Sequence, residues 1–293
     1  MKRRIDITPY LFILPAFLFF VVFILYPVIR ALLLAFQDYQ LTGEVRFVGF
    51  KNFVDGVIKD PVFWIAMKNT VLYSIVRVPI NVFVGLIIAT LIYQCSHRWQ
   101  SVFRAAYYLP GVISLVVISM VWKWLFNPNY GLLNQLLLKM QLITQPIPWL
   151  TSSKFALPSL MLMAILSSPG SAIILYLAAM SNIPKSLYEA ASLEGADEFT
   201  QWWKITVPLL NNTTLYLLVM NTIASFQVFT QVYVMTKGGP GYATTMVAPL
   251  IYFRAFKDYE FGIASAQALV LFLIILSISL IQFKYIRRRG EYI

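Results

Sequence analysis

Apolar residues along this chain come in six long runs, separated by shorter polar stretches. The runs span residues 10–36, 69–93, 102–125, 155–180, 207–236 and 261–285. Each is longer than the roughly 20 residues that a helix needs to cross the hydrocarbon core of a bilayer. The pattern therefore predicts an all-α polytopic membrane protein with six transmembrane helices, forming a single permease-like domain over residues 1–293.

The first run follows Lys2-Arg3-Arg4 and could be mistaken for a signal peptide. Its apolar stretch is too long for that, and no small-x-small cleavage site follows it. We therefore expect a retained helix.

Basic residues lie mainly in short polar stretches on one predicted side of the membrane. The chain is 59% hydrophobic and 12% charged, with a net charge of +11. The clusters on that side are Lys2, Arg3 and Arg4; His97, Arg98 and Arg104; and Lys284, Arg287, Arg288 and Arg289. Because cytoplasmic loops carry the excess of lysine and arginine, both termini are expected in the cytoplasm. Orientation in lipid explains the net charge, so no nucleic-acid partner is expected.

Two polar features lie apart from the runs. The residues Asn127-Pro128-Asn129-Tyr130-Gly131 predict a turn on the outer side, followed by an interfacial helix over 132–140. The single cysteine and the single histidine have no cluster of ligand-type residues around them, so no metal site is predicted.

The polar segment, residues 181–207, separates the fourth and fifth runs on the predicted cytoplasmic side. It holds four of the twelve acidic residues. Pro184 suits the first turn of a helix, Gly195 suits its end, and Asp197 can cap a second helix. In that second helix Phe199, Trp202, Trp203 and Thr206 recur at helical spacing. Two short helices with a bend could be an ordinary interfacial linker or a docking element for a protein outside the membrane.

The residues of the polar segment also match a known pattern. Glu189-Ala190-Ala191 and Gly195, followed by Ile205, Pro208 and Leu209, resemble the Glu-Ala-Ala loop of binding-protein-dependent ABC importer permeases. Further similarities favour the carbohydrate-uptake, maltose/glycerol-phosphate type and its first-permease branch. They are Leu14-Pro15, Tyr26-Pro27, residues 47–53, Leu109-Pro110, residues 124–128 with Gly131, and Gly238-Gly239-Pro240 with Thr244. Glu194 and Asn211 or Asn212 depart from the usual pattern, where Asp and Pro are common.

The resemblance implies a type I ABC importer permease fold in a bacterial or archaeal cytoplasmic (inner) membrane. It implies a second, homologous permease subunit, two ATPase subunits and an extracytoplasmic sugar-binding protein as partners, besides membrane lipid. The residues that match the ATPase-coupling loop are Glu189, Ala190, Ala191, Gly195, Ala196 and Pro208.

The source of energy can be argued without the resemblance. The apolar runs contain no Asp or Glu, which disfavours proton- or sodium-coupled carriers. The chain also lacks a G-x-x-x-x-G-K-[ST] phosphate loop. We therefore expect a non-catalytic transport subunit that binds no cofactor, with ATP and Mg held by a separate ATPase.

Polar and aromatic residues within the runs are candidates for the substrate path, because amides bind sugar hydroxyls and aromatic faces stack on sugar rings. The candidates are Asn221, Ser225, Phe226, Gln227, Phe229, Thr230, Tyr233, Arg77 and Asn81. Residues 226, 229 and 233 are expected on one helical face. For each residue taken alone, packing or a hydrogen bond between helices is the competing explanation. Arg77 could hold an anionic substrate, bind a carbonyl or snorkel, and we favour a structural role.

Three other functions remain open from the sequence. The chain could be a permease of the same superfamily for another solute, such as a glycerol phosphodiester, a polyamine or a peptide. It could be a self-sufficient carrier or channel. A membrane enzyme is disfavoured, because the loops lack a catalytic cluster of acids or histidines.

Overall fold

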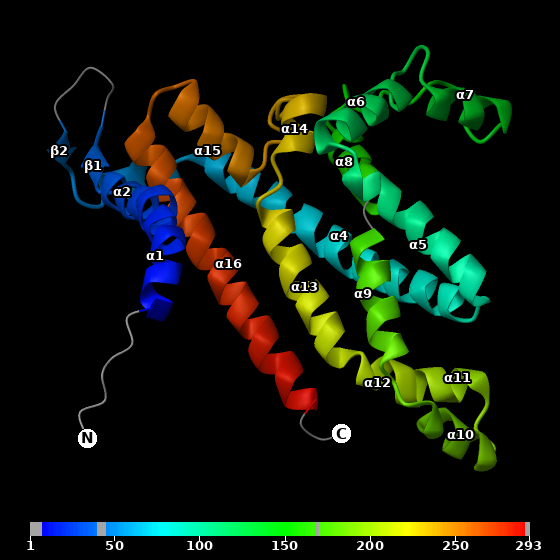
Figure 1. The fold of residues 1–293 in the computed structure, drawn as a ribbon. Helices are drawn as coiled ribbons and strands as arrows, with labels where there is room; N and C mark the ends of the chain where they lie inside the picture. The colour runs from blue at the N-terminus through cyan, green and yellow to red at the C-terminus, as the bar shows by residue number, and fades with distance from the viewer. Residues whose placement is uncertain (1–7, 40–44, 168–169, 291–293) are drawn as a thin grey trace, which may run out of the picture. The chain divides into compact units, whose positions relative to one another are not determined.

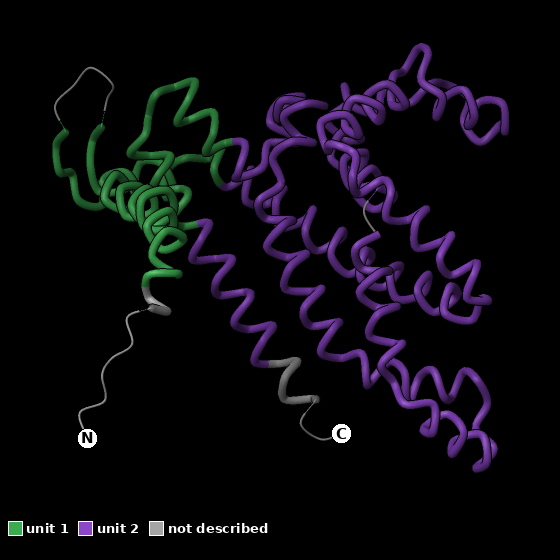
Figure 2. Tube along the Cα trace, in the orientation of Figure 1, with its two compact units in different colours: residues 1–63, 250–270 green, residues 64–249, 271–293 purple. Residues whose placement is uncertain are grey.

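The computed structural model describes residues 8–39, 45–167 and 170–290. The chain divides into two compact units, shown in Figure 2. Unit 1 contains residues 1–63 and 250–270, and unit 2 contains residues 64–249 and 271–293. The grouping of all residues into one domain stays a prediction.

Unit 1 begins with the first apolar run. Its elements are α1 (Thr8–Phe20), the π-helical turn η1 (Val21–Leu25), α2 (Tyr26–Leu34), the antiparallel strands β1 (Gln37–Asp38) and β2 (Arg46–Phe47), α3 (Lys51–Phe53) and the π-helical turn η2 (Val54–Ile58). Gln37 pairs with Phe47 in the sheet. The Asn52 amide donates to the carbonyls of Ala35 (3.1 Å) and Gln37 (2.9 Å), which fixes α3 against the end of α2.

Unit 2 holds most of the remaining helices. They are α4 (Pro61–Tyr93), α5 (His97–Val112), α6 (Leu115–Leu125), α7 (Leu132–Lys139), α8 (Ala156–Ser167), α9 (Gly170–Ser181), α10 (Lys185–Leu193), α11 (Glu198–Gln201), η3 (Trp202–Thr206), α12 (Val207–Leu209), α13 (Asn211–Phe226) and α14 (Thr230–Met235). Two helices, α15 (Val247–Phe256) and α16 (Phe261–Gly290), belong partly to each unit. Within unit 2, α4, α9 and α13 run between an end formed by α10 and α11 and an opposite end near α6 and α14 (Figure 1).

Two apolar clusters form the core of unit 2. The first surrounds Tyr73 of α4 with residues of α8 and α14. The second joins the C-terminal half of α4 to α9 and to Leu210 and Leu217. There α4 and α9 approach closely, because a Cβ at Gly85 would stand only 2.6 Å from the Cβ of Ala172. Small residues allow such close helix packing in membranes.

The number of apolar spans agrees with the prediction. Among the described residues, five helical segments are long and apolar enough to cross a membrane, and the bent pair α5 and α6 gives a sixth if it is counted as one span. The expectation of one straight helix over 102–125 is wrong, because α5 and α6 meet at an angle of 92°. Ile113 and Ser114 have extended backbone there, just after Pro110 and Gly111.

The fifth span, expected over 207–236, is also interrupted. The α-helix α13 ends at Phe226, and α14 begins only at Thr230, after Phe229 adopts a φ of −131°. The second span begins earlier than predicted, at Pro61, where proline is tolerated in a first helical turn. The turn after Asn127 is confirmed, because its side-chain oxygen accepts from the amides of Asn129 (2.9 Å) and Tyr130 (3.2 Å).

Candidate functional site

The first helix of the polar segment, α10, has defined ends. Pro184 has extended backbone (ψ 128°) and precedes the helix, whereas the sequence had placed it in the first turn. At the other end the amide of Ala196 donates to the carbonyl of Ala191 (2.9 Å), and the amide of Gly195 donates to that of Ser192 (3.1 Å). This is the Schellman pattern, and Gly195 takes the left-handed φ of +82° that it requires. The predicted end of the helix at Gly195 is confirmed.

A second helical stretch follows after one residue. The Asp197 carboxylate accepts a hydrogen bond from the amide of Thr200 (3.1 Å), so Asp197 is the predicted N-cap. Hydrogen bonds from the side chain and the amide of Thr200 lower the pKa of Asp197. The stretch continues from α11 through η3 into α12, where Pro208 occupies a first-turn position. The bend between α10 and α11 is therefore built from a glycine and an aspartate cap.

The aromatic residues of this stretch do not share one buried face, as the sequence had predicted. Thr206 is buried and Trp202 is half-buried, whereas Phe199 and Trp203 are 69% and 59% exposed. The cause is the π-helical turn at 202–206, whose wider hydrogen-bond spacing changes the register of the side chains. The Tyr188 hydroxyl lies 2.8 Å from the Thr206 hydroxyl and joins the two helices.

The residues that match the Glu-Ala-Ala pattern lie on the surface of unit 2. Glu189, Ala190 and Gly195 are exposed, whereas Ala191 and Ala196 are half-buried. A cavity of about 670 Å³ lies between the polar segment and the end of α4. Its lining includes Thr90 and Tyr93 of α4, Glu189 of α10 and Trp202. Glu189 is thus both accessible and close to a transmembrane helix.

The candidate path residues of α13 have mixed environments. Ser225 is fully buried, and its hydroxyl donates to the Ser74 hydroxyl of α4 (2.8 Å), a contact between helices. Phe226 is 3% exposed, and the Asn221 amide donates to the carbonyl of Leu217 in its own helix (2.8 Å). Gln227 is exposed at the break after α13.

The remaining path candidates lie in α14 and α4. Phe229 and Tyr233 stack with ring centroids 5.3 Å apart. Because the helix is broken before Thr230, the expectation that residue 226 shares a helical face with both rings is wrong. Arg77 is 9% exposed and lies 5.9 Å from the Tyr73 ring centroid, which argues against snorkelling. Asn81 is 1% exposed. Lining of the path by any of these residues stays a prediction.

Comparison with known families now decides what these helices belong to. A family described as "Binding-protein-dependent transport system inner membrane component" matches residues 81–290, well over half of the chain. The chain belongs to this family.

Two comparisons extend along almost the whole permease. It is 37% identical over 293 residues to the probable ABC transporter permease protein YurN of Bacillus subtilis, covering 99% of this chain and 100% of that one. It is 34% identical over 295 residues to the lactose transport system permease protein LacF of Rhizobium radiobacter, covering 99% and 97%.

A solved structure agrees with both. A chain of a bacterial alginate ABC transporter, in complex with an alginate pentasaccharide-bound periplasmic protein, superposes with a TM-score of 0.83 at 25% identity, covering 97% of this permease and 95% of that chain. The predicted permease fold, the resemblance to carbohydrate-uptake permeases and the multi-pass inner-membrane location are confirmed.

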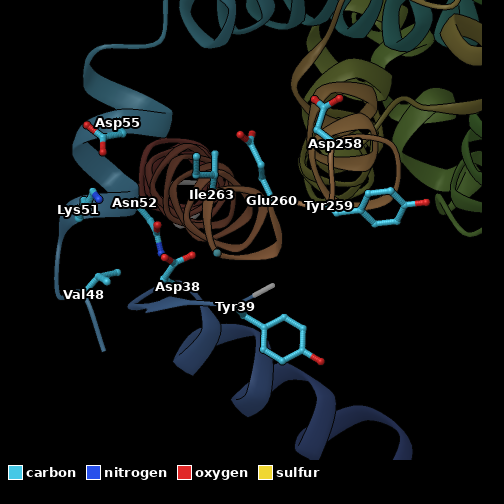
Figure 3. A pocket seen from close by; sticks show the side chains of 11 residues that line it. Asp38, Tyr39, Val48, Lys51, Asn52, Asp55, Asp258, Tyr259, Glu260 and Ile263 are labelled. Atoms are coloured by element: carbon cyan, nitrogen blue, oxygen red, sulfur yellow. The ribbon is translucent and has the colours of Figure 1, made fainter. Parts of the chain in front are cut away.

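Unit 1 of the permease contains a cavity that the sequence did not indicate. It has a volume of about 630 Å³ and is lined by Asp38, Tyr39, Val48, Lys51, Asn52, Asp55, Asp258, Tyr259, Glu260, Gly262 and Ile263. Figure 3 shows these side chains coming from β1, from α3 and η2, and from the start of α16. No local motif marks such a site, because its acidic residues come from distant parts of the chain.

Substitution of Gly195 tests the bend in the polar segment of the permease. Gly195→Val should lower ATP-driven uptake by the assembled complex about fivefold to tenfold, because a β-branched residue is strained by roughly 1–2 kcal/mol at positive φ. A Cβ at this position would meet nothing within 4 Å, so the effect comes from the backbone and not from a clash. Gly195→Asn is the matched control, since asparagine tolerates this conformation. Equal uptake by the two variants would contradict the assignment.

Proposed function

We propose that this permease is the membrane subunit of an ATP-driven importer that takes up a sugar or oligosaccharide delivered by an external binding protein. The carbohydrate named for each of two relatives, lactose and alginate, supports this class of solute. A permease for a glycerol phosphodiester, a polyamine or a peptide is the alternative within the same superfamily.

The observation that carries the proposal is the polar segment. A loop between two membrane helices has no packing reason to form two capped helices with a glycine bend and an exposed glutamate. Such a loop suits a docking element that is moved by another protein. Because the sequence has no phosphate loop, ATP and Mg belong on partner ATPase subunits in this proposal.

In the proposed mechanism, two ATPase subunits close on ATP and displace the polar segment together with the helices joined to it. Glu189 meets a basic residue in a groove of the ATPase, and charge-assisted pairing of this kind is directional as well as favourable. Displacement of the segment then opens a central cavity to the docked binding protein. A second, similar permease subunit completes the cavity.

Span five is the proposed wall of that cavity. The stacked rings of Phe229 and Tyr233 can pack on the apolar face of a sugar, and Asn221 and Gln227 can bind hydroxyl groups. Both amides lie near the interruption at 227–229, where backbone groups leave the helical pattern. Irregular backbone at membrane depth is tolerated where it lines a cavity, which supports this position for the path.

Reconstitution of the complex in liposomes tests the proposed function. The permease is co-purified with its partner permease and ATPase, and uptake of labelled sugar from a loaded binding protein is measured with ATP on the ATPase side. We expect uptake only when ATP and the binding protein are both present. Flux through liposomes that contain this chain alone would contradict the proposal. A panel of solutes offered to the binding protein separates sugars from the alternative solutes.

A further inference from the structure

The polar segment is attached to α4 by a hydrogen bond between side chains that are 112 residues apart in sequence. The indole Nε1 of Trp202 donates to the hydroxyl of Thr90 at 3.0 Å. That hydroxyl itself donates to the carbonyl of Leu86 at 2.9 Å, so its proton is used inside α4 and its lone pair receives the indole. Both hydrogen-bonding roles of Thr90 are therefore filled in one fixed geometry.

Trp202 moves with the rest of the polar segment, because the segment is cross-linked internally. Tyr188 of α10 is joined to Thr206 at 2.8 Å. The Gln201 amide donates to the Ser192 hydroxyl and to the Ala196 carbonyl, each at 2.9 Å. A displacement of α10 by a docked protein is thus passed to Trp202 by hydrogen bonds as well as by the chain.

At other levels, α4 is attached to two further parts of unit 2. The Ser225 hydroxyl of α13 donates to the Ser74 hydroxyl at 2.8 Å. The Asn69 amide donates to the carbonyls of Tyr242 (3.1 Å) and Thr245 (2.9 Å) in the loop after α14. Twenty-one residues of helix separate Asn69 from Thr90, which corresponds to about 30 Å along the helix axis. Attachments therefore exist near both ends of the membrane-crossing part of α4.

The cavity of about 670 Å³ shows why the inner attachment matters. It lies between the end of α4 and the polar segment, with Thr90 and Trp202 among its lining residues. Packing is incomplete there, so the segment could shift into the hollow without moving α4. The hydrogen bond at the rim of the hollow joins the two. Farther along, α4 continues without a break through Pro79.

We propose that α4 transmits the displacement of the polar segment to the loop at 236–246, with Trp202 and Thr90 as its inner positioning residues. The inference rests on the proposed function, in which an ATPase displaces the segment. It adds a route that the covalent connections of the segment, through α9 and α13, do not supply. Thr90 and Trp202 touch neither solute nor nucleotide in this proposal, and they act through the position of α4.

The test compares Thr90→Val and Trp202→Phe in the complete complex reconstituted with its binding protein. Each variant removes the hydrogen bond and keeps most of the side-chain volume. Uptake per ATP hydrolysed should fall about threefold to tenfold, the change that one lost hydrogen bond produces in a two-state equilibrium. The double variant should show no further loss, because both single changes remove the same bond. Thr90→Ser should restore coupling, and Trp203→Phe, at an exposed indole, is the matched control.

Three outcomes would overturn the inference. They are unchanged uptake per ATP in both single variants, multiplied losses in the double variant, and an equal loss in Trp203→Phe. Reduced amounts of folded complex would lower uptake and ATP hydrolysis together, and the ratio of the two is insensitive to this. The proposed function is tested separately in the same liposomes, since it fails if wild-type uptake does not require ATP. Wild-type uptake that requires ATP, with unaltered ratios in the variants, rejects only the role of α4.

Discussion

Replacement of Glu189 by lysine is expected to reduce ATP-driven uptake by the assembled complex at least tenfold. Glu189 is exposed on α10 and borders the cavity beside α4, so its carboxylate is available to a partner protein. A reversed charge would face the basic residue proposed in the ATPase groove, and like charges at an interface cost several kcal/mol. Because about 1.4 kcal/mol corresponds to a factor of ten in an equilibrium, even partial repulsion gives this loss.

The control for this variant is Glu194→Lys, which makes the same change of charge in the same helical pair. Glu194 lines a different hollow, on the Gly195 side of the segment. Uptake and the amount of ATPase that co-purifies with the permease are measured for both variants. A Glu189 variant that binds ATPase and transports like the Glu194 variant would show that docking does not depend on this carboxylate.

Replacement of Arg254 by methionine is expected to destabilise unit 1 by about 3 kcal/mol, the usual cost of leaving one member of a buried ion pair alone. Arg254 donates to Asp60 at 2.9 Å and to Glu260 at 3.0 Å. The Asp60 side chain is only 7% exposed, so its carboxylate would lose a charged partner away from water. The melting temperature of the purified protein in detergent should fall by several degrees.

A second ion pair of unit 1 provides the control. Lys59 and Asp55 are 3.7 Å apart, with side chains 71% and 42% exposed, and such surface pairs contribute little. Lys59→Met should leave the melting temperature nearly unchanged. The double variant Arg254→Met with Asp60→Asn should recover part of the loss, because it removes the stranded charge. Equal effects of the Arg254 and Lys59 variants would show that burial of Asp60 does not set the cost.

Much of the fold could be predicted from the sequence, because apolar length alone marks a span in lipid. The breaks within spans were harder. Residues near Ile113 and Phe229 are apolar on both sides of each break, so hydrophobicity does not distinguish a bent helix from a straight one. Pro110 and Gly111 precede the first break and were a usable signal. No comparable residue precedes the second break, which depends on packing of α14 against α6.

The candidate site was predictable where local chemistry sets the backbone. Gly195 and Asp197 each have a conformational preference strong enough to place a helix end. The π-helical turn at 202–206 was not foreseen, and with it the separation of Trp202 from Trp203 on the surface. Hydrogen bonds such as Trp202 to Thr90 and Ser225 to Ser74 join distant parts of the chain. Nothing in the spacing of these residues specifies such pairs.

The first membrane helix carries a consequence for handling this protein. In the segment Leu11–Leu34, none of the apolar window is buried by the described part of the chain. Its surroundings must then come from acyl chains or from a neighbouring polypeptide, and solubilisation exchanges those surroundings for surfactant. Limited proteolysis of a detergent extract should therefore release this N-terminal piece early, while the interior around Tyr73 and Ile173 keeps its protection.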